Sequence, residues 1–148
     1  MVRTHPPRTS DSTRLSLREV DGRTDQREYR EAIQESFSPE YGEAVQRVWS
    51  RPSAVDRQYV LAREGHQTVG AFSVHSLGPW TAIHDVCIHE AYRGRGFGSE
   101  LIQAVSAGMD RVHCPYLQCE DGWMPDFYRS VGFETVHRRT GFTVSRNK

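Results

Sequence analysis

Two neighbouring stretches in the middle of the chain, at 57–63 and 67–77, are strand-like runs of apolar residues with polar residues at their ends. The Glu-Gly-His sequence of residues 64–66 separates them and supplies a glycine where a tight turn needs one, so the pattern predicts a β-hairpin. A third strand-like run, 81–89, is rich in β-branched and small apolar residues, but His84 and Asp85 interrupt it. These three segments predict the centre of a β-sheet.

Helical and strand patterns flank these central strands on both sides. Apolar residues at helical spacing predict helices at 27–37, 41–50, 99–109 and 125–131. Shorter alternating runs predict further strands at 14–20, 116–120, 134–137 and 142–145. The resulting order, βααββ-βα-βα-ββ, predicts a mixed α/β arrangement on one sheet.

Length and composition limit the chain to one globular unit. At 148 residues and 17.0 kDa it can bury a single sizeable core, and its six Tyr, six Phe and three Trp supply bulky side chains for that core. Residues 1–13 are polar and lack the apolar stretch of a secretory signal. We therefore expect a flexible N-terminal leader at 1–13 and one domain at 14–148.

The charge and cysteine content exclude several classes of protein. Nineteen basic and nineteen acidic side chains give a net charge of zero, which argues against a dedicated binder of nucleic acid or anionic membranes. The stretch 67–83 lacks Asp, Glu, Lys and Arg, but it contains His, Pro and Gly and does not predict a membrane span. Three cysteines do not complete the paired pattern of a zinc site, so we expect reduced thiols, no metal and a cytoplasmic location.

A loop rich in glycine and arginine joins the third central strand to the helix that follows it. Glycines leave backbone N–H groups uncovered, and a helix N-terminus adds partial positive charge, so the loop is suited to hold a phosphate. Its residues are Arg93, Gly94, Arg95, Gly96, Phe97, Gly98 and Ser99. The alternative interpretation is a tight turn that needs glycine only for its backbone conformation.

Three other phosphate or RNA motifs fit this loop poorly. A P-loop would end in Gly-Lys-Ser/Thr, and a dinucleotide fingerprint would follow the first strand of its unit. The Arg-Gly-Arg-Gly run lies between a strand and a helix, whereas RNA-binding RGG segments occur in low-complexity tracts. These differences indicate that the loop belongs to another family of phosphate-binding loops.

Two motifs together resemble the GCN5-related N-acetyltransferase (GNAT) superfamily. Arg93-x-x-Gly96-x-Gly98 follows a strand, with Tyr92 before it, and resembles that family's loop for the pyrophosphate of acetyl-CoA. The segments 117–121 and 127–133 resemble its second signature, and the second of them ends in Gly-Phe. The resemblance implies an α/β GNAT fold, with a mixed central sheet of about six to seven strands flanked by about four helices. It also implies acetyl-CoA as co-substrate and no metal.

Within the superfamily, the second signature is most similar to the arylalkylamine (serotonin) N-acetyltransferase type. The shared residues are Cys119-Glu120-Asp121, Pro125 and Phe127-Tyr128, although Asp126 interrupts the pattern. That type carries two histidines on the strand before the loop. His84 matches the second, and Ala82 stands at the first.

Acetyl transfer to an amine requires a base for the ammonium proton and an acid near the leaving thiolate. His84 is the candidate base because imidazole titrates near neutral pH, and Asp85 and Glu120 are alternatives. Strand alternation predicts that His84 and Asp85 point to opposite faces of the sheet. The resemblance implies that Tyr128 is the acid beside the thioester sulfur. A buried histidine and a packed tyrosine are the structural alternatives.

The resemblance also implies how the rest of the donor binds. In this family the pantetheine amides pair with the strand before the loop, which here is Val86, Cys87 and Ile88. Aromatic side chains are candidates for an apolar acceptor slot, and Glu40 or Glu43 for a contact with the amine cation; these aromatics are Phe37, Tyr41, Trp49, Trp80 and Trp123.

The sequence therefore predicts an N-acetyltransferase that moves an acetyl group directly from acetyl-CoA to a primary amine or similar nitrogen of a small molecule. We expect a monomer or homodimer, with no nucleic-acid or membrane partner. Two alternatives stay open: an acetyltransferase of protein lysines or N-termini, and a CoA-binding regulatory module without catalysis.

Overall fold

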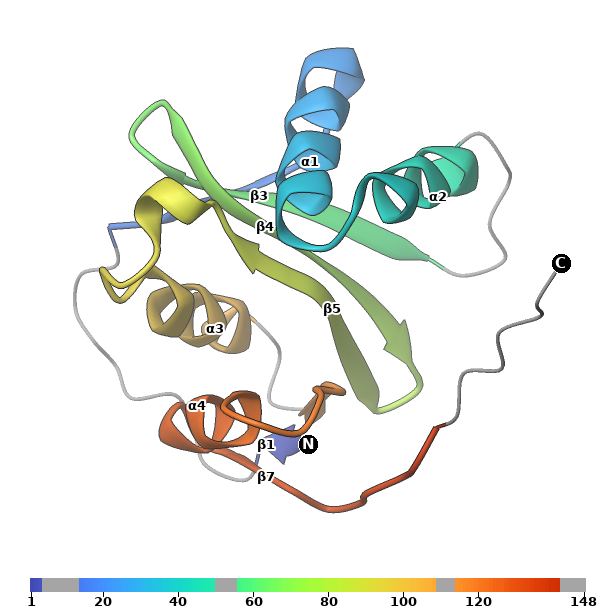
Figure 1. The fold of residues 1–148 in the computed structure, drawn as a ribbon, viewed down its shortest axis with the longest axis vertical. Helices are drawn as coiled ribbons and strands as arrows, with labels where there is room; N and C mark the ends of the chain where they lie inside the picture. Colours follow the sequence, from blue (N-terminus) through green and yellow to red (C-terminus); the bar gives the residue numbers. More distant parts are fainter. Residues whose placement is uncertain (4–13, 50–55, 109–113, 142–148) are drawn as a thin grey trace, which may run out of the picture.

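A seven-stranded mixed sheet lies at the centre of the molecule, with helices on both faces (Figure 1). The computed structural model describes residues 1–3, 14–49, 56–108 and 114–141. Within these ranges the strand order is β2-β3-β4-β5-β6-β1-β7. The strands are β1 (Val2–Arg3), β2 (Ser16–Glu19), β3 (Arg57–Glu64), β4 (Gln67–Leu77), β5 (Trp80–Ile88), β6 (Cys114–Tyr116) and β7 (Phe133–Glu134).

The described residues form four α-helices and one short 3₁₀ turn. The helices are α1 (Gly22–Ser36), α2 (Pro39–Trp49), α3 (Phe97–Ala107) and α4 (Met124–Ser130), and the 3₁₀ turn is η1 (Glu90–Tyr92). Figure 1 shows α1 and α2 on one side of the central strands and α3 and α4 on the other. The mixed α/β class predicted from the sequence is confirmed.

Each helical layer covers its own hydrophobic core. Tyr29 and Ile33 of α1 pack with Leu61 and Cys87 on one face of the sheet. On the other face, α3 and α4 cover a larger core whose buried residues include Val69, Phe72, Ile83, Phe97, Leu101, Tyr128 and Phe133. Because β5 passes between the two cores, the core that a side chain joins shows to which face of the sheet it points.

A buried ion-pair cluster fixes the first turn of α1 to the sheet. Asp25 is only 3% exposed, and its carboxylate lies 3.0 Å from Arg18 and 3.4 Å from Arg63. Arg63 also lies 2.9 Å from Glu28 one turn later. A buried carboxylate needs such partners to offset the loss of hydration. The cluster therefore positions the helix that reaches the site described below.

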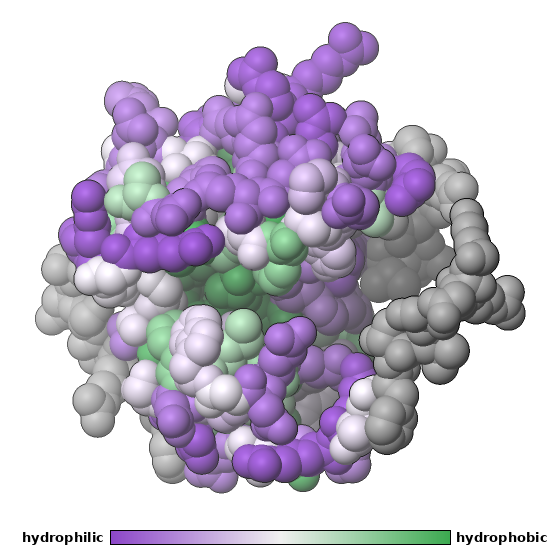
Figure 2. All heavy atoms as spheres, viewed as in Figure 1, coloured by the Kyte–Doolittle hydropathy of each residue, from purple (hydrophilic) through white to green (hydrophobic). Residues whose placement is uncertain are grey.

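The pairing of β5 with β6 is short, and it leaves an opening in the sheet. The parallel register runs only over Trp80↔Cys114, Thr81↔Pro115 and Ala82↔Tyr116. Beyond Ala82, β5 continues to Ile88 with no recorded β6 partner in the described residues. Figure 2 shows a hollow over β5, lined by hydrophobic surface and framed by hydrophilic side chains.

Several predicted boundaries differ from those observed. Helix α1 begins at Gly22 rather than residue 27, and α3 begins at Phe97 rather than residue 99. The strand predicted at 116–120 is β6 at 114–116, and the one predicted at 134–137 is β7 at 133–134. The predicted strand 142–145 lies outside the described residues.

The first residues of the predicted polar leader also differ from the prediction. Val2 and Arg3 form β1, which pairs antiparallel with β6 and β7. A polar stretch can still contribute backbone hydrogen bonds to a sheet, which side-chain polarity does not reveal. Residues 4–13 lie outside the described residues, so the rest of the leader stays a prediction. None of the described helices is long and apolar enough to cross a membrane.

Candidate functional site

A β-bulge interrupts β5 at the His84-Asp85 step that breaks the hydrophobic pattern. The register moves from Ala71↔Cys87 to Ser73↔His84, so that two residues of β5, Asp85 and Val86, lie opposite one residue of β4. Asp85 has a φ of 57°, and it is the one non-glycine residue with positive φ among those described. The bulge explains the interruption seen in the sequence.

The bulge reverses the predicted direction of the side chain of Asp85. Ile83 and Val86 both pack into the core under α3 and α4. The two residues between them, His84 and Asp85, both point to the face of α1 and α2, where Asp85 contacts Tyr29. The prediction that His84 and Asp85 point apart is wrong, because an extra residue in a strand shifts the alternation by one position.

Three hydroxyl groups from three different elements converge on the Asp85 carboxylate. Ser73 of β4 donates at 2.9 Å and Tyr29 of α1 at 3.4 Å, and Tyr41 of α2 donates to the other carboxylate oxygen. Burial and the neighbouring Asp85 carboxylate raise the pKa of Tyr41 to about 12. Asp85 therefore accepts hydrogen bonds that hold both helices to the bulge, which assigns this alternative base a structural role.

The candidate base His84 has a second histidine beside it. Its Nε2 atom lies 3.0 Å from Nδ1 of His75 on β4. Burial is the main cause that lowers the pKa of both rings, and the positive charge of Arg57 lowers them further. An imidazole with a pKa below its ordinary value of about 6.5 is neutral at pH 7 and able to accept a proton. His84 thus has the protonation state that a base needs.

The backbone of β5 presents its free edge at Val86 and Ile88. His89 donates its backbone N–H to Val69 at 2.9 Å, and Cys87 pairs with Ala71, so the backbone groups of these two residues face β4. Because backbone direction alternates along a regular strand, the backbone groups of Ile88 and the carbonyl of Val86 face the side from which β6 has departed. The Ile88 carbonyl there accepts from Nε of Arg93 at 2.9 Å.

The side chain of Cys87 points to the opposite face of the sheet from those of its neighbours, Val86 and Ile88. Its side chain is 5% exposed in the core under α1, and burial raises the pKa of its thiol to about 11. At Gly70, opposite this stretch, an added Cβ would lie 2.3 Å from the Cys87 carbonyl oxygen. Of the three residues predicted to flank pantetheine, the geometry leaves Val86 and Ile88 with backbone groups on the open side.

The predicted phosphate loop follows directly after this edge. Gly94 and Gly96 have φ of 75° and 84°, and both are exposed with no protein atom closer than 3.9 Å to an added Cβ. Gly96 is the N-cap of α3 and no side chain caps this helix end. The first backbone N–H groups of α3 have no partner within the helix and point toward solvent beside the glycines.

The remaining loop residues divide between core and surface. Phe97 is 1% exposed and belongs to the core, while Gly98 packs with its Cα beside the Phe127 ring. Arg95 is exposed, with its guanidinium 5.5 Å from the centre of the Tyr92 ring. Ser99 is half-buried in the first turn of α3. For Phe97, only its backbone N–H is available to a ligand.

Two residues that the sequence analysis did not consider brace the loop. Arg14 donates to the carbonyl of Arg95 at 2.8 Å and pairs with Glu100 at 2.5 Å. Glu35, at the end of α1, accepts from the backbone N–H of Glu90 at 2.7 Å. These contacts join residues 81 or 55 positions apart in the chain, so no local pattern could have indicated them.

The candidate acid Tyr128 lies on the opposite face of the sheet from His84. It is 9% exposed in α4, and its ring packs against Phe127 and Phe133. Burial, and then the nearby Cys119, raise the pKa of its phenol to about 12. Among the described residues, its hydroxyl has no recorded hydrogen-bond partner, which leaves it available to a ligand.

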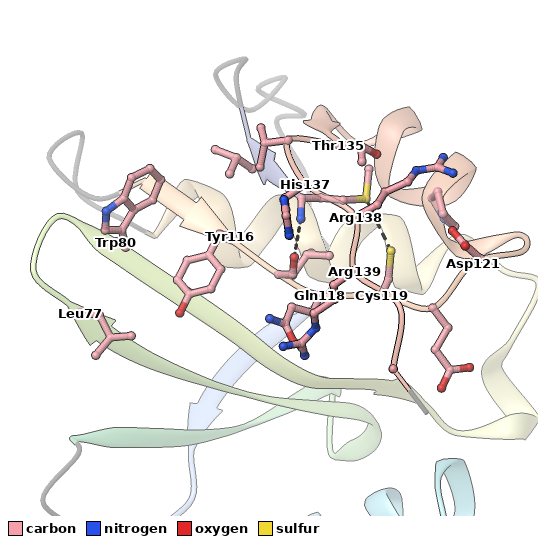
Figure 3. Close-up of a pocket in the computed structure, with 17 residues that line it drawn as sticks. Leu77, Trp80, Tyr116, Gln118, Cys119, Asp121, Thr135, His137, Arg138 and Arg139 are labelled. Carbon is pink, nitrogen blue, oxygen red and sulfur yellow. Dashed lines mark hydrogen bonds between the residues drawn. The ribbon is translucent and has the colours of Figure 1, made fainter. Parts of the chain in front are cut away.

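A cavity of about 870 Å³ opens next to β6 (Figure 3). Its wall includes Leu77, Trp80 and Tyr116, and its other side is formed by residues 117–121, 135–139 and Gly141. Trp80 and Tyr116 are 6.3 Å apart in an edge-to-face arrangement. Strand alternation places Trp80 on the same face of β5 as Ala82 and His84. The cavity thus lies at the start of β5, and neither His75 nor His84 is among the residues that line it.

Other candidate residues have different surroundings. Trp49 packs edge-to-face on Tyr29 and Tyr59, so this aromatic belongs to the core and not to an acceptor slot. Cys87, Cys114 and Cys119 form no disulfide. Within the described ranges, no three His, Cys, Asp or Glu side chains gather in a cluster that could hold a metal ion.

Comparison with known families and structures gives a consistent result. A family model described as Acetyltransferase (GNAT) domain matches residues 55–135. This range contains β3 to β6, the glycine loop, α3 and α4. No curated protein sequence matches the chain.

Solved structures share the fold at low sequence identity. A protein from Novosphingobium aromaticivorans, described as an acetyltransferase of the GNAT family, is 22% identical over 90% of this chain, with a TM-score of 0.65; the chain spans 56% of its length. An aminoglycoside acetyltransferase from an uncultured soil metagenomic sample is 17% identical over 90% of this chain and 97% of its own, with a TM-score of 0.59. Glucosamine-6-phosphate N-acetyltransferase from Arabidopsis thaliana is 14% identical over 88% and 99%, with a TM-score of 0.55.

The hydroxyl network predicts how substitutions at Asp85 change stability. Asp85→Ala removes the carboxylate that accepts from Ser73, Tyr29 and Tyr41, and it keeps a Cβ in the left-handed region. We expect the free energy of unfolding to fall by about 2–4 kcal/mol. Asp85→Gly loses the same hydrogen bonds but relaxes the backbone, so it should lose about 1 kcal/mol less. Urea denaturation of both variants measures the two effects, and a wild-type midpoint for Asp85→Ala would contradict the network.

Proposed function

Because the chain belongs to the GNAT acetyltransferase family, whose members use acetyl-CoA as co-substrate, we propose that it transfers the acetyl group to the primary amine of a small molecule. The observation that carries the proposal is the continuous line from the opening between β5 and β6, along Val86 and Ile88, to the uncapped N-terminus of α3. This line offers backbone hydrogen bonds first and an anion site at its end.

The residues present fit the chemical parts of acetyl-CoA. Pantetheine amides need backbone partners, and the free edge of β5 supplies them at Val86 and Ile88. The pyrophosphate needs N–H donors and positive charge, which the loop from Arg93 to Ser99 offers through its glycines, the start of α3 and the exposed Arg95. Arg93 acts by bracing, since its guanidinium binds Ile88.

The thioester supplies a carbonyl that an amine can attack and a thiolate that then departs. In this proposal His84 accepts the proton of the incoming ammonium, which its neutral state at pH 7 permits. Tyr128 donates a hydrogen bond to the departing sulfur. With its pKa raised to about 12, the phenol holds its own proton firmly, so it acts chiefly by stabilising negative charge.

The acceptor side supports an amine with an apolar or aromatic body. Phe37, Tyr41 and Trp80 are exposed large aromatics, and Tyr41 reaches Asp85 on the His84 side of the sheet. Glu120 lines the cavity that Trp80 also lines, and it offers a carboxylate to a cation. An arylalkylamine is the acceptor that the second motif favours. Cytoplasmic location and a monomeric or homodimeric state stay predictions of the sequence.

An acceptor panel tests the function. Arylalkylamines, polyamines, aminoglycosides, hydrazines and peptides, each supplied with acetyl-CoA, should show CoA release that is fastest with a small amine. Gly96→Asp places a carboxylate at the proposed phosphate site and should weaken acetyl-CoA binding about 10-fold or more in calorimetry. Gly65→Asp is the matched control, since Gly65 also has positive φ, 59°, with no atom within 4 Å of an added Cβ.

The panel and the variant contradict the proposal in different ways. Faster turnover of peptides than of any small amine would favour a protein acceptor. Equal acetyl-CoA affinity in the folded Gly96→Asp and Gly65→Asp variants would remove the glycine loop from donor binding.

Removal of the Tyr128 hydroxyl tests the acid side. Tyr128→Phe keeps the ring packing, so acetyl-CoA affinity should stay the same while kcat falls by about 10- to 100-fold. Because the Tyr128 pKa is about 12, any alkaline limb of the rate profile below pH 10 should persist in the variant. Tyr59→Phe, within the core under α1, is a control for loss of a hydroxyl. A Tyr128→Phe enzyme with normal kcat would refute the assignment.

The pH dependence of kcat/KM tests the base side. The lowered pKa of His84 means that the ring becomes a competent base at a pH below its ordinary value of about 6.5, so the acid limb should lie below that pH. His84→Gln should lower kcat/KM about 10- to 100-fold near pH 7, with a smaller deficit at high pH, where free amine is abundant. A greater loss in Glu120→Gln than in His84→Gln would transfer the role to Glu120.

A further inference from the structure

The side chains of His75 and His84 form a hydrogen bond across two neighbouring strands. His84 Nε2 and His75 Nδ1 are 3.0 Å apart, and the rings are parallel within 2° with centroids 4.8 Å apart. The register pairs His75 with Ala82, two residues before His84. Two neutral imidazoles share such a contact only when one of the two nitrogens carries the hydrogen. The contact therefore couples the tautomers of the two rings.

Each ring has a second nitrogen outside this contact. Among the described residues, no hydrogen-bond partner is recorded for Nδ1 of His84 or for Nε2 of His75. Both rings are half-buried, and His75 is the less deeply buried of the two. The pair therefore has one open nitrogen at the inner ring and one at the outer ring, joined by a hydrogen bond.

The charges around the pair oppose a lasting imidazolium. Arg57 of β3 pairs in register with His75, and its charge lowers the pKa of both rings. Asp85 beside His84 has the opposite, smaller effect on the pKa of that ring. Burial and the charge of Arg57 therefore disfavour a lasting positive charge on either ring, which favours release of the proton to water.

We propose that His75 and His84 form a relay that carries the ammonium proton of the acceptor to solvent. This inference rests on the proposed function and adds His75 to it. The relay starts with hydrogen on Nε2 of His84 and on Nε2 of His75. The ammonium N–H bond breaks, its electron pair stays on the amine nitrogen, and the proton bonds to Nδ1 of His84.

The second half of the relay moves a different proton. The Nε2–H bond of His84 breaks as an Nδ1–H bond forms on His75, and His75 then releases its Nε2 proton to water. Ammonium has become amine, one proton has entered the solvent, and both rings are neutral. Proton exchange with water returns them to their first tautomers before the next turnover.

Substitution of His75 tests the relay. Glutamine keeps hydrogen-bonding groups but cannot carry a proton, so His75→Gln should lower kcat/KM for the best amine about 5- to 50-fold at pH 7. Acetyl-CoA affinity and Tm should match the wild type, and the deficit should shrink at high pH. His66→Gln, in the exposed turn between β3 and β4, is a control for loss of a histidine and should keep the wild-type rate.

Three further measurements separate a proton carrier from a packing residue. Added imidazole should restore the rate of His75→Ala as its concentration rises, which a purely structural defect would not allow. In His84→Gln, the further change His75→Gln should cost less than 2-fold, because the relay is already broken. Nitrogen-15 NMR of the wild type should find His84 protonated at Nε2 and bare at Nδ1.

The relay is overturned if His75→Gln keeps the wild-type rate and pH profile, if imidazole fails to restore His75→Ala, or if His84 carries its hydrogen on Nδ1. Failure of the proposed function gives a different result: the wild type would bind acetyl-CoA and acetylate no small amine. A wild type that is active while His75→Gln is unaffected would remove only the relay.

Discussion

The left-handed backbone at Asp85 is the constraint on which the site depends. A residue with a Cβ pays about 1–2 kcal/mol for this conformation, and the three hydroxyl groups around the carboxylate offset that cost. If β5 were regular, Asp85 would point into the core under α3 and α4. The bulge instead brings it to the side of His84, while Val86 still packs on the opposite face.

One helix connects the two ends of the site. Tyr29 of α1 contacts the bulge, and Glu35, six residues later and about 9 Å along the helix axis, binds the turn that opens the glycine loop. Asp25 fixes the start of the same helix to β2 and β3. The geometry of the bulge and that of the loop are therefore set by a single rigid element.

Local signals predicted much of this architecture from the sequence. The hairpin around Gly65, the glycine loop and the order of the central elements all follow from neighbouring residues, and the structure contains them. Residues 84–85 showed that the strand was interrupted, but periodicity alone could not show how the alternation would resume. The contacts of Arg14 and Glu35 join distant segments, and the contact of His75 depends on the register of two neighbouring strands.

The proposed use of backbone groups at Val86 and Ile88 has an evolutionary consequence. A strand edge presents the same N–H and C=O groups whatever side chains it carries, so substitution there leaves donor recognition intact as long as the strand keeps its shape. Selection then acts on the packing that shapes the edge and on the acceptor side, where side-chain identity matters. Under this proposal such a fold can change its side chains widely while it keeps the strand edge, and the three solved structures compared above share the fold at 14–22% identity.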